Sequence, residues 1–245
     1  MQGERAGIMR IYADLHLCPP LDDVANAQSM AGILSEIQTG VVGLVISPDR
    51  LTPTPPALSS FRDMGIDAAR RLNLNPRSRE ELLRSLRKLR SKYEIIAVEC
   101  TTPSVSRVAV RDKRVDIVRF PKQRSGSTFR RNLASTCRAA LEINMSELTQ
   151  SLEFETRLHG LRRQIEIAAE TSTRVIGSTN ASNSFGLRAP KDVAAILEML
   201  GLPPEAALKS VSETPVAIVN ENRLRIGDPQ VDEGVKIIKR STNNE

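Results

Sequence analysis

The feature that most constrains the fold of this 245-residue chain is an alternation between two kinds of segment. Short runs rich in Val, Ile and Ala alternate with longer segments in which apolar residues recur at the spacing of an amphipathic helix. Successive runs begin roughly 20–35 residues apart, which leaves room for one crossover helix between neighbouring parallel strands. This pattern is typical of repeated β/α units.

The apolar runs predict seven strands, at Ile11–Leu15, Val41–Ile46, Ile66–Ala69, Ile95–Val98, Ile117–Arg119, Ala139–Ile143 and Val175–Gly177. Helices are expected at Val24–Ile37, Glu80–Ser91, Phe129–Cys137, Leu158–Thr171, Pro190–Leu200 and Pro203–Ser210. Seven β/α units in a chain of this length favour a single TIM-like β/α barrel over an open doubly wound sheet. We expect one domain over residues 10–240, with residues 1–9 and 241–245 as flexible ends.

The positive charge of the chain is concentrated in its middle third. Residues 61–140 carry twenty Lys/Arg against eight Asp/Glu, a net charge of +12, whereas the segments before and after them are each at −3. Arginine predominates among these cations, and its planar guanidinium suits two-point contacts with phosphate. Such asymmetry indicates a polyanionic partner, although it says nothing about the fold.

Composition excludes several other classes of protein. With no Trp, two Tyr and five Phe, the chain lacks the aromatic platforms of a single-strand nucleic-acid binder. Its three cysteines have no metal-ligand spacing, and no predicted strand leads into a glycine-rich nucleotide-binding loop. The longest apolar run is too short to span a bilayer. We therefore expect a soluble cytoplasmic protein with no membrane partner and no bound cofactor.

Polar residues lie at the carboxyl ends of several predicted strands, where β/α barrels place their chemistry. Asp14 and His16 end the first strand, Glu99 follows the fourth, and Glu142 lies in the sixth. A metal held by such residues would activate water for phosphoester hydrolysis. The chain has only two histidines, however, and a polynuclear site usually needs several imidazoles. We favour a structural role for His16 and assign no catalytic residue, while a relic or weak metal site at these four positions stays open.

Several strings in the sequence resemble one known family. The run VDIVRFP, a Ser-Gly turn and FRRNLASTCRAALEIN are followed by LRRQIEIAAETSTRVIGSTNASNSFGLRAPKDVAAILEMLG. Their order and spacing resemble the archaeal and eukaryotic ribonuclease P protein component 3 family, with YADLHL and IIAVEC where the first and fourth strands of that family would lie. The similarity spans nearly the whole chain.

The resemblance implies a β/α barrel related to the polymerase-and-histidinol-phosphatase (PHP) metal hydrolases, with a degenerate metal site. It implies a protein subunit of ribonuclease P, the ribonucleoprotein that removes the 5′ leader of precursor tRNA. The chemistry would belong to the ribonuclease P RNA and its Mg²⁺, while the protein supports that RNA together with protein component 2.

The basic residues expected to face RNA come from the charged middle third. They are Arg87, Lys88, Arg107, Arg111, Lys113, Arg114, Lys122, Arg124, Arg130 and Arg131. Folded RNA is recognised largely through its shape and backbone, which needs no aromatic platform. Two alternatives remain from the sequence: an active metal-dependent phosphoesterase, and a basic module that binds an acidic protein without RNA.

Overall fold

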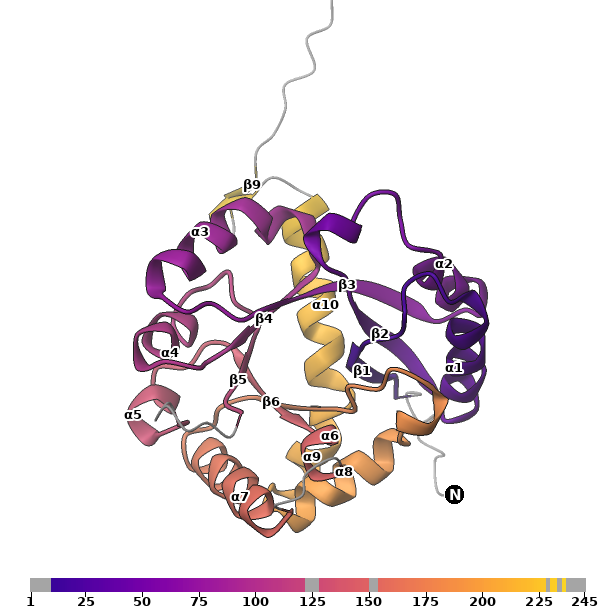
Figure 1. The fold of residues 1–245 in the computed structure, drawn as a ribbon. Helices are drawn as coiled ribbons and strands as arrows, with labels where there is room; N and C mark the ends of the chain where they lie inside the picture. Colours follow the sequence, from indigo (N-terminus) through magenta and orange to yellow (C-terminus); the bar gives the residue numbers. More distant parts are fainter. Residues whose placement is uncertain (1–9, 122–127, 150–153, 228–229, 233–234, 237–245) are drawn as a thin grey trace, which may run out of the picture.

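The strands of this protein form one parallel sheet that curls into a nearly closed barrel surrounded by helices (Figure 1). The computed structural model describes residues 10–121, 128–149, 154–227, 230–232 and 235–236. The seven strands follow one another in chain order, from β1 to β7, and every neighbouring pair is parallel. The predicted TIM-like β/α barrel is therefore confirmed. The segments 1–9 and 241–245, expected to be flexible, lie outside the described residues.

The barrel strands occupy the predicted segments, most of them with shifted ends. They are β1 (Tyr12–Leu17), β2 (Thr39–Val45), β3 (Asp67–Leu74), β4 (Ile95–Glu99), β5 (Ile117–Arg119), β6 (Ala140–Asn144) and β7 (Val175–Ser178). A further antiparallel pair, β8 (Gln230–Asp232) and β9 (Val235–Lys236), follows near the C-terminus. The largest difference is in β3, which continues five residues past its predicted end, because Arg71 is buried inside the barrel in an ion pair with Glu142.

The α-helices lie around the strands. They are α1 (Val24–Glu36), α2 (Pro56–Asp63), α3 (Arg79–Leu89), α4 (Pro103–Ala109), α5 (Arg131–Ala134), α6 (Ser146–Thr149), α7 (Phe154–Glu170), α8 (Pro190–Met199), α9 (Pro204–Ser210) and α10 (Glu213–Gly227). Short 3-10 turns lie at η1 (Pro48–Arg50), η2 (Arg90–Lys92) and η3 (Ser184–Gly186). Sequence analysis missed α2, α4, α6 and α10, and it placed α5 in a longer segment. Of these, α4 is a short helix rich in Ser and Val, residues with weak helical preference.

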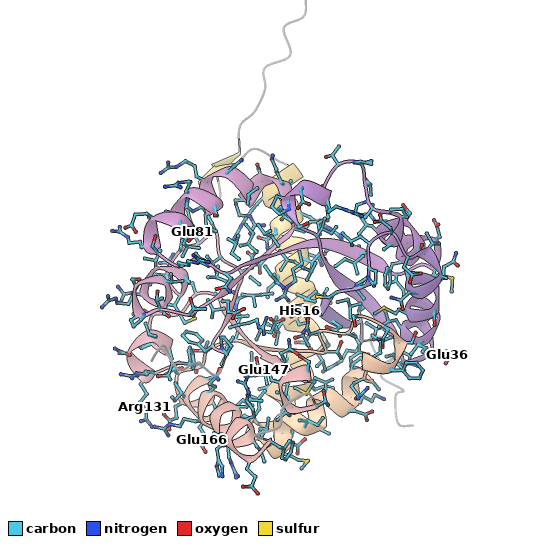
Figure 2. All side chains as sticks on the ribbon, viewed as in Figure 1. His16, Glu36, Glu81, Arg131, Glu147 and Glu166 are labelled. Carbon is cyan, nitrogen blue, oxygen red and sulfur yellow. The ribbon has the colours of Figure 1, made fainter. Side chains whose placement is uncertain are left out.

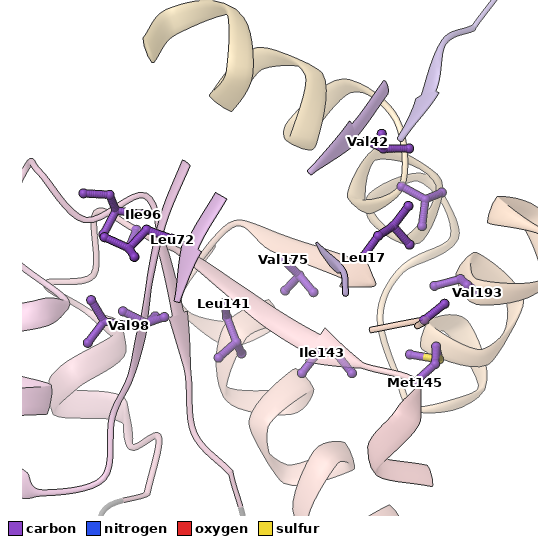
Figure 3. Packing of buried hydrophobic residues seen from close by; sticks show 14 of the residues in the cluster. Leu17, Val42, Leu72, Ile96, Val98, Leu141, Ile143, Met145, Val175 and Val193 are labelled. Carbon is purple, nitrogen blue, oxygen red and sulfur yellow. The ribbon is translucent and has the colours of Figure 1, made fainter. Parts of the chain in front are cut away.

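Two apolar clusters hold the fold together. The larger lies between the strands and the surrounding helices, and its members include Leu17, Val42, Leu141, Ile143 and Val193 (Figure 3). The smaller fills the barrel interior with Ala, Val, Leu and Ile side chains from all seven strands and with two residues of α10. The interior of a small barrel is thus a packed apolar core and not a channel.

Helix α10 crosses the middle of the ring of strands and closes one end of the barrel (Figure 1). Its Ile218 and Val219 are buried in the barrel interior. Its Arg223 forms ion pairs with Asp67, the first residue of β3, and with Glu94, which directly precedes β4. Both partners mark the N-terminal ends of strands, so α10 covers the end of the barrel opposite to the one that usually carries chemistry.

Between β1 and β7 the ring is completed by the segment that follows β7. Leu17 and Ala181 form an isolated parallel bridge, and the Cys18 amide donates to the Ala181 carbonyl at 2.8 Å. At the other end of β1, the Ala13 amide donates to the Val211 carbonyl at 2.9 Å. Among the described residues, no helix is both long and apolar enough to cross a membrane.

Candidate functional site

A buried ion pair occupies the C-terminal end of the barrel interior. Arg71 of β3 is 0% exposed and Glu142 of β6 is 3% exposed. The Arg71 Nη1 and Nη2 atoms donate to the two carboxylate oxygens of Glu142 at 2.6 and 2.7 Å. Nη1 also donates to the Leu15 carbonyl at 2.9 Å. Two-point pairing of this kind satisfies both carboxylate oxygens at once.

His16 and Asn73 extend this pair into a closed ring of four side chains. Arg71 Nε donates to Asn73 Oδ1 at 2.7 Å, and Asn73 Nδ2 lies 3.0 Å from His16 Nε2. The ring returns through His16 Nδ1, which lies 3.3 Å from Glu142 Oε2. His16 Nδ1 also has Asn144 Nδ2 at 3.5 Å, farther away than the Glu142 carboxylate. The shorter contacts therefore favour a neutral imidazole that accepts from Asn73 at Nε2 and carries its proton on Nδ1, facing Glu142.

The protonation states in this ring follow from burial and neighbouring charge. Burial and, to a lesser degree, the adjacent Arg71 cation lower the pKa of His16 to about 4, although Glu142 acts in the opposite direction. Burial alone would raise the pKa of Glu142, but Arg71 and His16 hold that pKa well below its ordinary value. At neutral pH the ring therefore contains one guanidinium, one carboxylate and a neutral imidazole, so it carries no net charge.

Asp14 points to a different set of partners. Its carboxylate accepts hydrogen bonds from the His16 amide at 3.0 Å and from the Thr179 amide at 3.2 Å. The Thr179 hydroxyl donates to it as well. Burial raises the pKa of Asp14 to about 6, although these hydrogen bonds act in the opposite direction. Asp14 thus ties the end of β1 to the segment that follows β7.

These residues do not fit a metal. Both oxygens of Glu142 accept from Arg71, and Asp14 is occupied by amides and a hydroxyl. The guanidinium lies where a cation bound to Glu142 would have to lie, and like charges exclude one another. Within the described residues there is no group of three or more His, Cys, Asp or Glu side chains placed to hold an ion. Glu99, the fourth expected ligand, lies at the end of β4, opposite Arg119 of β5 in the sheet.

Further arginines at the same end of the barrel are also paired with carboxylates. Arg119 lies 3.5 Å from both Glu142 and Glu147, and Arg157 donates to Glu147 at 3.2 Å. In the view of Figure 2, His16 and Glu147 lie nearer the centre of the molecule, whereas Arg131 of α5 and Glu166 of α7 lie at its outer edge. The C-terminal end of the barrel thus has little unpaired charge with which to bind a charged ligand.

Sequence reasoning missed Arg71 and Asn73, which form the hydrogen-bonded ring with Glu142 and His16 at the C-terminal end of the barrel. The available signal was the alternation Ala69, Arg71, Asn73, which places all three on the same face of β3. The predicted strand stopped at Ala69, directly before Arg70 and Arg71. An interior arginine is understandable only when its partner Glu142, 71 residues later, is known to lie across the barrel.

Unbalanced positive charge gathers instead around the N-terminal end of the barrel. A groove of about 780 Å³ is lined there by seven Lys/Arg residues and two carboxylates, among other residues. We call this the basic groove and define it by Arg87, Lys113, Arg114, Arg138, Arg174 and Arg225. A second hollow, beside Arg111 and Thr136, adjoins it and shares Lys113, Arg114 and Arg138 with it.

The structure brings together only some of the predicted RNA-facing residues. Arg87, Lys113 and Arg114 line the basic groove, and Arg111 lines the adjoining hollow. Lys88 and Arg107 are exposed on α3 and α4 without lining either hollow, and Arg130 is exposed next to α5. Arg131 donates to both oxygens of Glu170 at 2.6 and 2.7 Å, so it already has an acidic partner. Lys122 and Arg124 lie outside the described residues.

Fold and site together define a β/α barrel whose usual catalytic end is closed by an internal ion pair. A sequence model of the family described as RNase P subunit p30 matches residues 23–227. The chain belongs to the RNase P subunit p30 family. It is accordingly a protein subunit of ribonuclease P, the enzyme complex that processes the 5′ end of tRNA.

Individual relatives agree with this assignment. The ribonuclease P protein component 3 of Methanococcoides burtonii is 26% identical over 238 residues, which cover 95% of this chain and 96% of that protein. The protein of the same name from Methanocaldococcus jannaschii is 30% identical over 174 residues, which cover 69% of this chain and 74% of that protein.

Solved structures show the same fold. A chain in a structure of archaeal ribonuclease P with mature tRNA superposes with a TM-score of 0.75 at 24% identity, covering 94% of this chain and 99% of that chain. A probable 2-pyrone-4,6-dicarboxylic acid hydrolase of Acinetobacter baumannii gives a TM-score of 0.58 at 10% identity, with coverages of 85% and 99%. The fold is therefore shared with hydrolase barrels as well.

Proposed function

We propose that this subunit works by binding RNA and not by cutting it. Its partners would be the ribonuclease P RNA, precursor tRNA within the assembled enzyme, and protein component 2, in a cytoplasmic complex. The cleavage chemistry would lie with the RNA and its Mg²⁺. The observation that carries this proposal is the Arg71–Glu142 pair, because it takes up the C-terminal end of the barrel interior, where β/α-barrel enzymes place their catalytic groups.

The distribution of charge supports the same proposal. Cations at the C-terminal end are matched with carboxylates, as Arg71 is with Glu142 and Arg157 with Glu147. The chain nevertheless has a formal net charge of +6, and much of its positive charge surrounds the opposite end. A positive surface attracts a polyanion at long range and orients it before contact.

Reconstitution tests the proposal. The purified chain is added with protein component 2 to the ribonuclease P RNA, and cleavage of precursor tRNA is measured at limiting Mg²⁺. We expect the pair of proteins to raise the cleavage rate and lower the Mg²⁺ requirement, because protein cations offset phosphate repulsion within the RNA. Equal rates with and without the chain would contradict the proposal.

The same preparation separates the RNA-binding role from the alternative of a basic protein-interaction module. Nuclease treatment of the assembled complex should release this chain wherever RNA holds it. If the chain instead stays in the complex after the RNA is digested, and the RNA-free complex keeps its full activity, the function belongs to protein contacts alone.

A further inference from the structure

The basic groove is formed largely by residues that precede successive strands of the barrel. Arg138 and Arg174 precede β6 and β7, Lys113 and Arg114 precede β5, and Arg87 lies in the last turn of α3. In a parallel β/α barrel, every connection from a helix to the next strand lies at the N-terminal end. Residues far apart in the sequence therefore meet at one rim, and Arg225 of α10 joins them there.

The carboxylates beside the groove are largely committed to other partners. Asp116 accepts from Arg90 at 2.5 Å and from the Ile96 amide at 2.7 Å. Asp112 pairs with Arg114 at 2.7 Å. Glu221 of α10 also lines the groove and is the one remaining acid among its described lining residues.

Several cations of the groove have no carboxylate partner among the described residues. Across the described part of the chain, no carboxylate lies within ion-pair distance of Arg87, Arg138, Arg174 or Arg225, and all four are exposed. The guanidinium of Arg174 donates to the Arg138 carbonyl at 2.9 Å, which fixes its position at the rim. Placing unpaired like charges side by side is unfavourable unless an anion completes the cluster.

The apolar lining of the groove comes from the packed cores and is not aromatic. Leu86 and Val115 line it and belong to the larger cluster, and Ile218 belongs to the smaller one. None of the lining residues that the structure describes is aromatic. Stacking of bases therefore has no platform here, whereas a chain of phosphates needs only spaced cations on a fixed surface.

We propose that the basic groove is the RNA-contact surface of this subunit and holds a stretch of the phosphate backbone. This inference rests on the proposed function, and it specifies that RNA meets the N-terminal end of the barrel. The closed C-terminal end would face away from the contact. Arg138, Arg174 and Arg225 thereby join the RNA-facing set, although none of them was predicted from the sequence.

The test compares two triple variants of the full chain. The groove variant carries Arg138→Gln, Arg174→Gln and Arg225→Gln. The matched control carries Arg62→Gln, Arg188→Gln and Lys191→Gln, which remove the same charge from exposed positions that do not line the groove. Affinity for the ribonuclease P RNA is measured over a range of salt concentrations, and thermal unfolding verifies that each variant is folded.

We expect the slope of log affinity against log salt to become shallower by roughly 2–3 in the groove variant, close to one for each lost phosphate contact. The control should keep the slope of the original protein. A third variant with lysine at the same three groove positions should recover most of the slope, since lysine restores the charge.

Three outcomes would overturn the inference in distinct ways. If the original chain binds RNA and the groove variant has the same affinity and slope, RNA contacts another surface while the proposed function stands. If the groove variant binds RNA normally but no longer binds protein component 2, the groove is a protein contact. If the original chain neither binds the RNA nor stimulates cleavage, the proposed function fails together with this inference.

Discussion

Arg71 and Glu142 face each other across the interior of the barrel and form a two-point ion pair from which solvent is excluded. Arg71 comes from β3 and Glu142 from β6, so the pair joins opposite sides of the ring. Taking both ions out of water is costly, and the cost is offset only while each ion keeps its partner. The pair thus fills the C-terminal end of the barrel interior with two buried ions that are matched to each other.

Breaking this pair from one side should destabilise the fold. Arg71→Met leaves Glu142 charged and buried, and we expect it to lower the free energy of unfolding by about 3–5 kcal/mol. The double variant Arg71→Met with Glu142→Leu should recover much of that loss, because it leaves no unpaired ion. Urea unfolding measures both. Arg84→Met, at an exposed position on α3, is the control and should change stability by less than about 0.5 kcal/mol. A single variant as stable as the original chain would contradict the structural role of the pair.

Asp14 and His16 should give opposite dependences of stability on pH. The pKa of Asp14 rises from 3.8 to about 6 on folding, so its contribution is complete below pH 3.8 and is lost as the pH rises through 6. The pKa of His16 falls from 6.5 to about 4, so its contribution is complete above pH 6.5 and is lost as the pH falls through 4. The two contributions largely cancel in the original chain between these limits.

Single variants expose each contribution. Relative to the original chain, Asp14→Asn should show a free energy of unfolding that rises more steeply with pH, because the His16 contribution is no longer opposed. His16→Asn should show the reverse slope. Each difference can reach about 1.4 kcal/mol per pH unit. Urea unfolding between about pH 4.5 and 6 measures the slopes, and parallel profiles for all three proteins would exclude these pKa shifts.

Divalent metals should neither stabilise the isolated chain nor make it a hydrolase. Because the Arg71 guanidinium occupies both oxygens of Glu142, we expect Mn²⁺ or Zn²⁺ to leave the midpoint of thermal unfolding unchanged. Turnover of a simple phosphoester should match that of buffer containing the same metal. Hydrolysis by the purified chain that disappears in His16→Ala would instead revive the phosphoesterase alternative.

Two glycines make a matched pair for testing how tightly the first two strands pack. A Cβ added at Gly43 of β2 would lie 2.3 Å from the Leu15 carbonyl oxygen, and backbone cannot move aside cheaply. Gly43→Ala should therefore destabilise the fold by about 1–3 kcal/mol or more. Gly32 of α1 has no atom within 4 Å of such a Cβ, so Gly32→Ala should stabilise the helix by roughly 0.5–1 kcal/mol. Equal effects of the two changes in urea unfolding would contradict this packing.

The amino-acid sequence by itself determined the architecture. Short apolar runs such as Ile117–Arg119 and Ile95–Val98 coincide with observed strands or nearly so, because buried parallel strands need continuous apolar residues whatever their partners. Successive β/α units can be arranged in only a few sheet topologies, which is why seven of them indicated a barrel. The order of the same strings also indicated the family.

The tertiary structure alone decided what the two ends of the barrel can do. In the sequence, Asp14, His16 and Glu142 have the character of metal ligands, and nothing local shows that Arg71 reaches across the barrel to Glu142. Likewise, Arg138, Arg174 and Arg225 are scattered in the chain. They meet only because the helix-to-strand connections share one end of the barrel and α10 covers that end. Ion pairing acts through space over a few ångströms, so the partner of a charge depends on the closed fold and not on its sequence neighbours.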